Sequence, residues 1–90
     1  MSDDQVTAAV HRVIDRYDPE GLLAMGAPQD EYRPEVEDLA ALVRGAEPIT
    51  PERVAAVWSR WFNGMADWST RRPEQVAEVA ATLEELRRTR

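Results

Sequence analysis

Glycine and proline divide this 90-residue chain into segments, and this division constrains the fold more than any other feature of the sequence. All four glycines and all six prolines fall between, or at the first turn of, four segments with helical periodicity. Proline removes a helical hydrogen bond and glycine weakens a helix, so both residues mark boundaries. The expected helices run over about residues 3–17, 34–44 and 73–87, and a further one opens at Thr50-Pro51, with an apolar stripe that reaches Met65 and a break allowed at Asn63-Gly64.

Each segment carries a single stripe of apolar residues at i, i+3, i+4 and i+7, the spacing of one helix face. The residues expected in the core are Tyr17, Leu39, Val57, Trp61, Val79 and Leu83. No window alternates between apolar and polar residues with β-branched enrichment, so no sheet is expected. Because such helices must pack together to bury their stripes, the sequence predicts an all-α fold. We expect a small bundle of four main helices in a single domain over residues 1–90.

The connection over residues 18–33 is too long for a simple turn between helices and too apolar in its middle for a solvated linker. We expect a one-turn helix that caps the core, formed by Leu22, Leu23 and Met25. Gly26 is expected to end this turn. The sequence therefore predicts an ordered segment between the first two helices.

The charge balance excludes several classes of partner. The chain has 17 acidic residues against 11 basic ones, a net charge of −6, and every basic residue is an arginine. This acidity argues against nucleic acid, whose affinity depends on neutralising phosphates, and is compatible with a basic protein partner. No apolar run approaches the ~20 residues of a membrane span, and the acidic start Ser2-Asp3-Asp4 lacks the basic region of a signal peptide. We therefore expect no membrane partner and a cytoplasmic location.

The absence of cysteine excludes a disulfide scaffold and any cysteine-based zinc or redox site. His11 is the single histidine, so a transition-metal site would have to consist largely of carboxylates, and no stretch has the spacing of a calcium-binding loop. His11 lies away from the apolar stripe of its helix and is expected to face solvent, with no nucleophile organised beside it. The sequence indicates neither a cofactor nor a catalytic site.

The connection between the first two helices carries two motifs that resemble a known family. They read Asp18-Pro19-x-Gly21-Leu22-Leu23 and Gly26-Ala27-Pro28-x-Asp30-Glu31-Tyr32. With a later aromatic segment, Trp61-Phe62-Asn63-Gly64, they resemble the domain of unknown function 1871 family of short bacterial helical proteins, over about residues 13–64. The chain departs from the family's pattern at Tyr17, where tryptophan is common, and at Arg33, where an acidic residue is usual. The resemblance implies a compact all-α fold and no established activity.

Asp30, Glu31 and Tyr32 form a candidate partner-binding segment before the second helix. In one interpretation Asp30 or Glu31 caps that helix while Tyr32 packs its ring on the core. In the other, the segment presents its carboxylates to arginine or lysine side chains of a partner. We expect Asp30 to be the cap and Glu31 to be the exposed residue.

The aromatic residues in the second half of the chain provide the other candidate. Trp58, Trp61 and Phe62 lie on one predicted helix, and at least two of them are expected in the core. Trp68 follows in the loop between the third and fourth helices, outside any stripe. Trp68 is therefore either a lid on the core or an exposed residue of the kind enriched at interfaces.

Small size, acidity and the lack of a catalytic constellation favour a non-enzymatic protein-binding accessory module. Its expected contact residues are Asp30, Glu31, Tyr32 and Trp68. A concrete form of this hypothesis is an immunity-type protein that neutralises a basic toxin, because charge complementarity speeds such association. The alternative is a small enzyme or ligand-binding protein with a pocket lined by Trp58, Trp61 and Tyr32. A third hypothesis is a homo-oligomeric structural protein.

Overall fold

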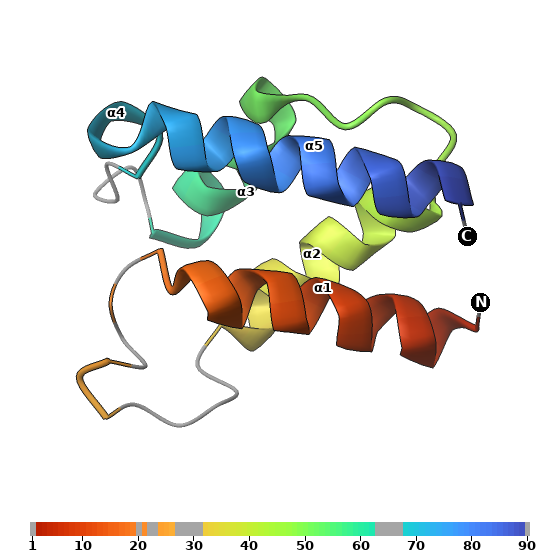
Figure 1. The fold of residues 1–90 in the computed structure, drawn as a ribbon, viewed down its shortest axis with the longest axis horizontal. Coiled ribbons are helices and arrows are strands. Elements are labelled where there is room, and N and C mark those ends of the chain that lie inside the picture. The colour runs from red at the N-terminus through yellow and green to blue at the C-terminus, as the bar shows by residue number, and fades with distance from the viewer. Residues whose placement is uncertain (1, 20, 22–23, 27–31, 63–67, 90) are drawn as a thin grey trace.

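A computed structural model describes residues 2–19, 21, 24–26, 32–62 and 68–89 of the chain (Figure 1). These residues form five helices and no strand, which confirms the all-α prediction for the described part of the chain. The helices are α1 (Asp3–Tyr17), α2 (Arg33–Arg44), α3 (Pro51–Phe62), α4 (Trp68–Arg71) and α5 (Pro73–Thr89). Within the described residues, no helix has both the length and the apolar character needed to cross a membrane.

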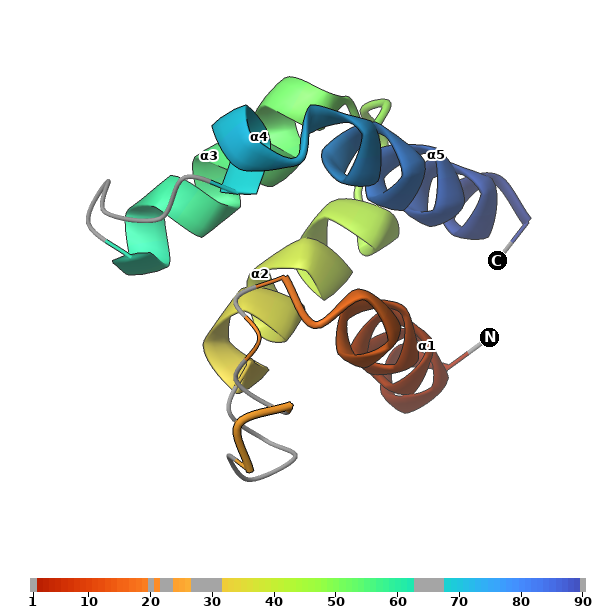
Figure 2. The same cartoon turned by 60° about the vertical axis from the view of Figure 1, so that its left-hand side comes forward.

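Helix α2 occupies the middle of the molecule and contacts α1, α3 and α5 (Figure 2). Helices α1 and α5 run in opposite directions, so both ends of the chain lie at the same side of the molecule (Figure 1). Helices α3 and α5 pack together, and α4 contacts both of them. The sequence did not predict α4, because its four residues are too few to show helical periodicity.

One cluster of buried side chains draws on all five helices. Its members are Val6, Val10, Ile14, Tyr32, Val36, Leu39, Ala40, Val43, Ile49, Val54, Trp58, Trp68, Val76, Val79, Ala80 and Leu83. Leu39, Val79 and Leu83 are fully buried, as predicted, whereas Tyr17 and Val57 are partly exposed and pack against the cluster. The folded chain exposes 5450 Å², close to the roughly 5,300 Å² that surface scaling gives for its mass.

Trp61 was expected in the core, and this prediction is wrong because 42 % of its surface is exposed. Trp58, one helical turn earlier on α3, is only 2 % exposed. The indole N–H of Trp61 donates to Asp38 on α2, so the ring lies at the edge of the α2–α3 contact, where a carboxylate remains accessible to water.

Side chains cap the amino ends of α1 and α3. Ser2 Oγ accepts from the backbone N–H of Gln5 at 3.2 Å, and Gln5 Oε1 accepts from the backbone N–H of Ser2 at 2.9 Å, which forms a capping box before α1. Thr50 caps α3, because its hydroxyl accepts from the backbone N–H of Arg53 at 3.3 Å. Gly45, directly after α2, is extended (φ −80°, ψ 175°), so the chain leaves α2 into an extended connection.

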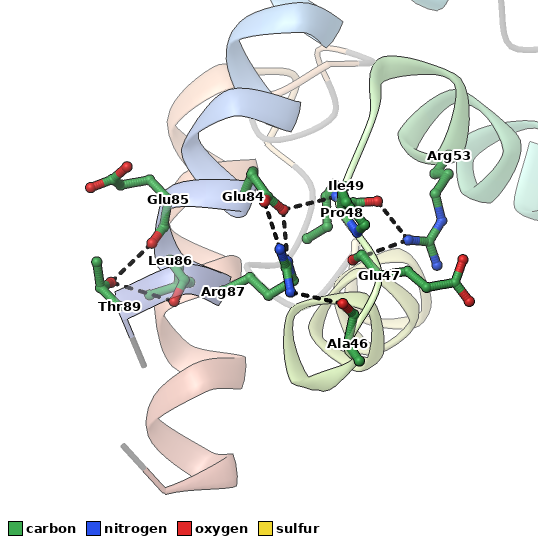
Figure 3. Close-up of polar contacts among 10 residues, drawn as sticks. All are labelled: Ala46, Glu47, Pro48, Ile49, Arg53, Glu84, Glu85, Leu86, Arg87 and Thr89. Carbon is green, nitrogen blue, oxygen red and sulfur yellow. Dashed lines mark hydrogen bonds and ion pairs between the residues drawn. The ribbon is translucent and has the colours of Figure 1, made fainter.

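That connection, residues 45–50, is held against α5 by a polar cluster (Figure 3). The Glu84 carboxylate accepts from the backbone N–H of Ile49 at 2.9 Å and from two nitrogens of Arg87, each at 2.7 Å. Arg87 also donates to the carbonyl of Ala46 at 3.1 Å. The hydrogen bonds from Arg87 and then from the Ile49 backbone lower the pKa of Glu84 to about 2.

Candidate functional site

Of the four residues predicted to bind a partner, the structure places two, and both are buried. Tyr32 and Trp68 are 0 % and 1 % exposed, so the expectation that they face a partner is corrected: both belong to the core. Asp30 and Glu31 lie outside the described residues. The N-cap position of α2 is Tyr32, which makes no side-chain capping bond there.

Tyr32 and Trp68 are buried because they pack against a third aromatic residue. The ring centroid of Trp58 lies 5.8 Å from that of Tyr32 and 4.7 Å from that of Trp68. The Tyr32 hydroxyl donates to Asp18 at 2.6 Å, and the Trp68 indole N–H donates to Gln75 at 3.0 Å, so both polar atoms are satisfied inside. The structure therefore agrees with the interpretation of Trp68 as a lid on the core.

Asp18 organises the connection between α1 and α2 through both of its carboxylate oxygens. It follows α1 in the left-handed conformation, with a φ of 46°, and so ends the helix. One carboxylate oxygen accepts from the Tyr32 hydroxyl, and the other accepts from the backbone N–H of Ala24 at 3.0 Å. The hydrogen bond between Asp18 and Tyr32 thus joins two residues whose sequence numbers differ by 14.

A second contact joins this connection to the other half of the molecule. Arg71, the last residue of α4, donates to the carbonyl of Pro19 at 2.8 Å. Met25 was expected to cap the core together with Leu22 and Leu23, but its side chain is 81 % exposed, so that prediction is wrong for Met25. Leu22 and Leu23 lie outside the described residues.

Trp61 is the exposed side chain that the structure holds in a fixed orientation. Its indole N–H donates to an oxygen of Asp38 at 2.7 Å. The guanidinium carbon of Arg60 lies 5.6 Å from the centroid of the same indole ring, within cation–π range, and a guanidinium nitrogen lies 3.6 Å from the same Asp38 oxygen. We call Asp38, Arg60 and Trp61 the Trp61 site.

Two helices build the Trp61 site. Helix α3 supplies Arg60 and Trp61 near its carboxyl end, and α2 supplies Asp38 near its middle. The side chains of Arg60 and Asp38 are 72 % and 30 % exposed, so all three residues remain accessible to a partner. The site therefore presents an apolar ring whose one polar atom is already bonded, beside one cation and one partly shielded anion.

A groove with mostly polar lining residues lies between α1 and α2, has a volume of about 560 Å³, and is lined in part by His11. His11, expected to face solvent, is partly buried, and its Nε2 lies 3.3 Å from an oxygen of Asp15. The Thr7 hydroxyl, one turn earlier, is 3.4 Å from the donating guanidinium nitrogen of Arg44. Among the residues that the structure describes, no group of three or more histidine and carboxylate side chains could hold a metal ion.

Comparisons of the chain with protein-family models, with curated proteins and with solved structures find no match. The resemblance to the domain of unknown function 1871 family therefore stays a prediction. Tyr32 and Trp58 fill the interior while Trp61 lies on the surface, so these three residues do not line a common pocket.

Sequence reasoning missed the Trp61 site because it assigned Trp61 to the apolar stripe of α3. One signal was available in the sequence. A helix of 12 residues that carries Trp58, Trp61 and Phe62 has more aromatic surface than one narrow stripe can bury in a small protein.

Proposed function

We propose that the chain is a non-enzymatic, acidic protein-binding module and that the Trp61 site is the centre of its contact with a partner. The observation that carries this proposal is the exposed indole ring, bonded to Asp38 at 2.7 Å and approached by the guanidinium of Arg60. Tryptophan and arginine are enriched among the few residues that dominate the binding energy of protein interfaces. A surface tryptophan beside an arginine is the arrangement expected of such a contact centre.

The fixed orientation of Trp61 favours binding for an entropic reason. Immobilising a free side chain at an interface costs ~0.5–1.5 kcal/mol, and the bond to Asp38 restrains this ring before a partner arrives. Because the indole N–H already has an acceptor, a partner can cover the ring without leaving a buried donor unpaired.

The proposed partner is a basic protein. The chain has a net charge of −6, which attracts a positively charged partner and speeds its association. A specific form of the proposal is an immunity-type protein that neutralises a basic toxin. Asp30 and Glu31 precede Tyr32 and α2 in the sequence, and we include their carboxylates as acidic contacts to be tested separately.

The test compares the wild-type chain with the Trp61→Ala variant as baits in cells that produce the chain. Quantitative mass spectrometry should find a basic protein that the wild type retains and the variant loses. Ser59→Ala is the matched control, because Ser59 is also exposed on α3, and this variant should retain the partner.

The captured protein is then purified, and its affinity is measured by calorimetry. Trp61→Ala should weaken binding by ~30-fold or more, the effect of losing a dominant interface residue. Trp61→Phe keeps an aromatic ring but loses the bond to Asp38, so it should weaken binding less. Equal affinities for the wild type and Trp61→Ala would overturn the Trp61 site as the contact centre.

Two further measurements address the partner's nature. If the partner is a toxin, it arrests growth when produced alone, and the wild-type chain but not Trp61→Ala restores growth; a harmless partner would remove the immunity form of the proposal. Asp30→Ala and Glu31→Ala should each slow association and weaken its salt dependence. Unchanged association rates would exclude these two carboxylates from the interface.

A further inference from the structure

A groove with an apolar floor runs between α1 and α5, separate from the Trp61 site. Its volume is about 390 Å³, and Ala9, Val13 and Leu86 contribute apolar side chains to its lining. All three residues are partly exposed, and Val13 and Leu86 also pack against the core. The two helices run antiparallel along the groove (Figures 1 and 2). At one end they are linked by the Tyr17 hydroxyl, which donates to Glu78 on α5 at 3.1 Å.

The two walls of this groove carry opposite charges. Helix α1 contributes Arg12 and Arg16, which are one turn apart, and α5 contributes Glu85. All three side chains are exposed, and none forms an ion pair with another residue of the described part of the chain. The Arg16 guanidinium carbon lies 6.0 Å from the Tyr17 ring centroid, a contact that leaves its charge uncompensated.

This distribution of charge is complementary to itself. Two copies can be related by a two-fold axis that runs parallel to the groove, between the two molecules. This rotation places α1 of one copy opposite α5 of the other, and each residue keeps its position along the axis. The arginine wall of each copy would then face Glu85 of its partner, and the two apolar floors would meet between them. We propose that the chain forms a two-fold symmetric homodimer through the α1–α5 groove.

Charge also argues for a second copy over other occupants. A strongly acidic ligand or an anionic membrane surface would face Glu85 as well as the two arginines. A strongly basic segment would be repelled by Arg12 and Arg16. A second copy presents one wall of each sign, so each wall of the groove faces side chains of opposite charge.

The experiment uses sedimentation equilibrium of the full chain over a range of concentrations. The wild type should show a concentration-dependent monomer–dimer equilibrium. The Arg12→Glu/Arg16→Glu variant has two negative walls, and the Glu85→Arg variant has two positive walls, so each alone should be monomeric, with a dimer Kd raised at least tenfold. An equimolar mixture of the two should form a heterodimer, because every wall then faces its opposite.

Several outcomes would overturn the proposal. A wild type that stays monomeric up to about millimolar concentration excludes the dimer. A dimer that persists in both variants, or two variants that do not combine, excludes the groove as its interface. Glu52→Arg, an exposed charge reversal on α3, is the control and should dimerise like the wild type.

Circular dichroism verifies that each variant is folded. If a charge reversal unfolds the chain, Arg12→Gln/Arg16→Gln and Glu85→Gln replace it, and each should still weaken the dimer. Equal dimer Kd values for the wild type and both neutral variants would overturn the proposal. Trp61→Ala should leave the dimer Kd unchanged. The homodimer proposal and the proposal of a partner at the Trp61 site can therefore be overturned separately.

Discussion

The two connections that flank α2 are fixed by different means. The connection after α2 is held along its length by charged side chains from other segments (Figure 3). Glu84 and Arg87 of α5 bond to its backbone at Ile49 and Ala46, and Arg53 of α3 donates to two further carbonyls, at 2.7 Å and 3.3 Å. Among the described residues of the connection before α2, the two carboxylate oxygens of Asp18 accept from Ala24 and Tyr32 of the same connection, and Arg71 of α4 donates to Pro19.

The difference shows two ways to satisfy backbone groups outside helices. Buried or partly buried N–H and C=O groups need partners, and an extended segment cannot supply them to itself. After α2, a distant helix supplies them, so the connection depends on a carboxylate that must stay ionised. Before α2, the carboxylate of Asp18 bonds within its own connection, to the backbone amide of Ala24 and to the buried hydroxyl of Tyr32.

The largest expected effect comes from truncating Tyr32, the buried residue directly before α2. Tyr32→Ala should lower the free energy of unfolding by ~3–5 kcal/mol, because it empties a fully buried site beside Trp58. Ile49→Ala, the matching change in the second connection, should cost ~2–4 kcal/mol. Urea unfolding followed by circular dichroism measures both. A cost below ~1 kcal/mol for Tyr32→Ala would show that its ring does not anchor the connection.

Asp18 is expected to give the next largest effect. Asp18→Ala should cost ~1–3 kcal/mol, because it leaves the Tyr32 hydroxyl without its acceptor. Asp18→Gly loses the same bonds but fits the φ of 46° without strain, so it should be less destabilising than Asp18→Ala by ~1 kcal/mol. In a double-mutant cycle with Tyr32→Phe, the two costs should not add. Additive costs would mean that the hydrogen bond contributes nothing to stability.

Glu84 makes the connection after α2 sensitive to pH. Its pKa is about 2 in the folded chain against an ordinary value of 4.5, so the ionised carboxylate stabilises the fold above pH 4.5. This contribution should disappear as the pH falls from 4.5 to 2. Glu84→Gln should therefore lower Tm at pH 7, and the difference from the wild type should shrink through this window.

The matched control for this measurement is Glu47→Gln, which removes an exposed carboxylate from the same connection. It should lower Tm at pH 7 by less than Glu84→Gln does, because it leaves the bonds to Glu84 intact. If Glu84→Gln kept a constant difference in Tm from pH 7 to pH 2, the carboxylate would not be the group that holds this connection.

The smallest effects are expected from the two arginines that donate to loop carbonyls. Arg71→Ala removes the bond to Pro19, and Arg53→Ala removes the bonds to Pro48 and Glu47. We expect a cost of ~0.5–1.5 kcal/mol for each bond lost, since net hydrogen-bond contributions are of this size. Thermal unfolding of the two variants at pH 7 measures both costs. A variant with an unchanged Tm would show that its arginine does not stabilise the connection that it contacts.

The sequence by itself determined the four longer helices and part of the core. Proline, glycine and apolar spacing act within a few residues, so they predicted α1, α2, α3 and α5 to within about two residues. The same spacing placed Leu39, Val79 and Leu83 in the interior. These features are local, and no knowledge of how the helices pack is needed to recognise them.

Only the tertiary structure decided which aromatic rings are covered. Trp61 lies on an apolar stripe and is exposed, whereas Trp68 lies outside any stripe and is buried against Trp58. A stripe defines the direction that a side chain points but not where the neighbouring helix ends. The Trp61 site therefore required the position of Asp38, which is 23 residues away in the sequence.

The same reason explains the polar contacts that hold the two connections. Glu84 and Ile49 are 35 residues apart, and Arg71 and Pro19 are 52 apart. Such pairs form only when segments distant in the sequence are brought together by burial of the core, and no local pattern encodes which carbonyl or amide a charged side chain will meet. The sequence determined where the helices lie along the chain, and their packing determined which surfaces and which charges remained outside.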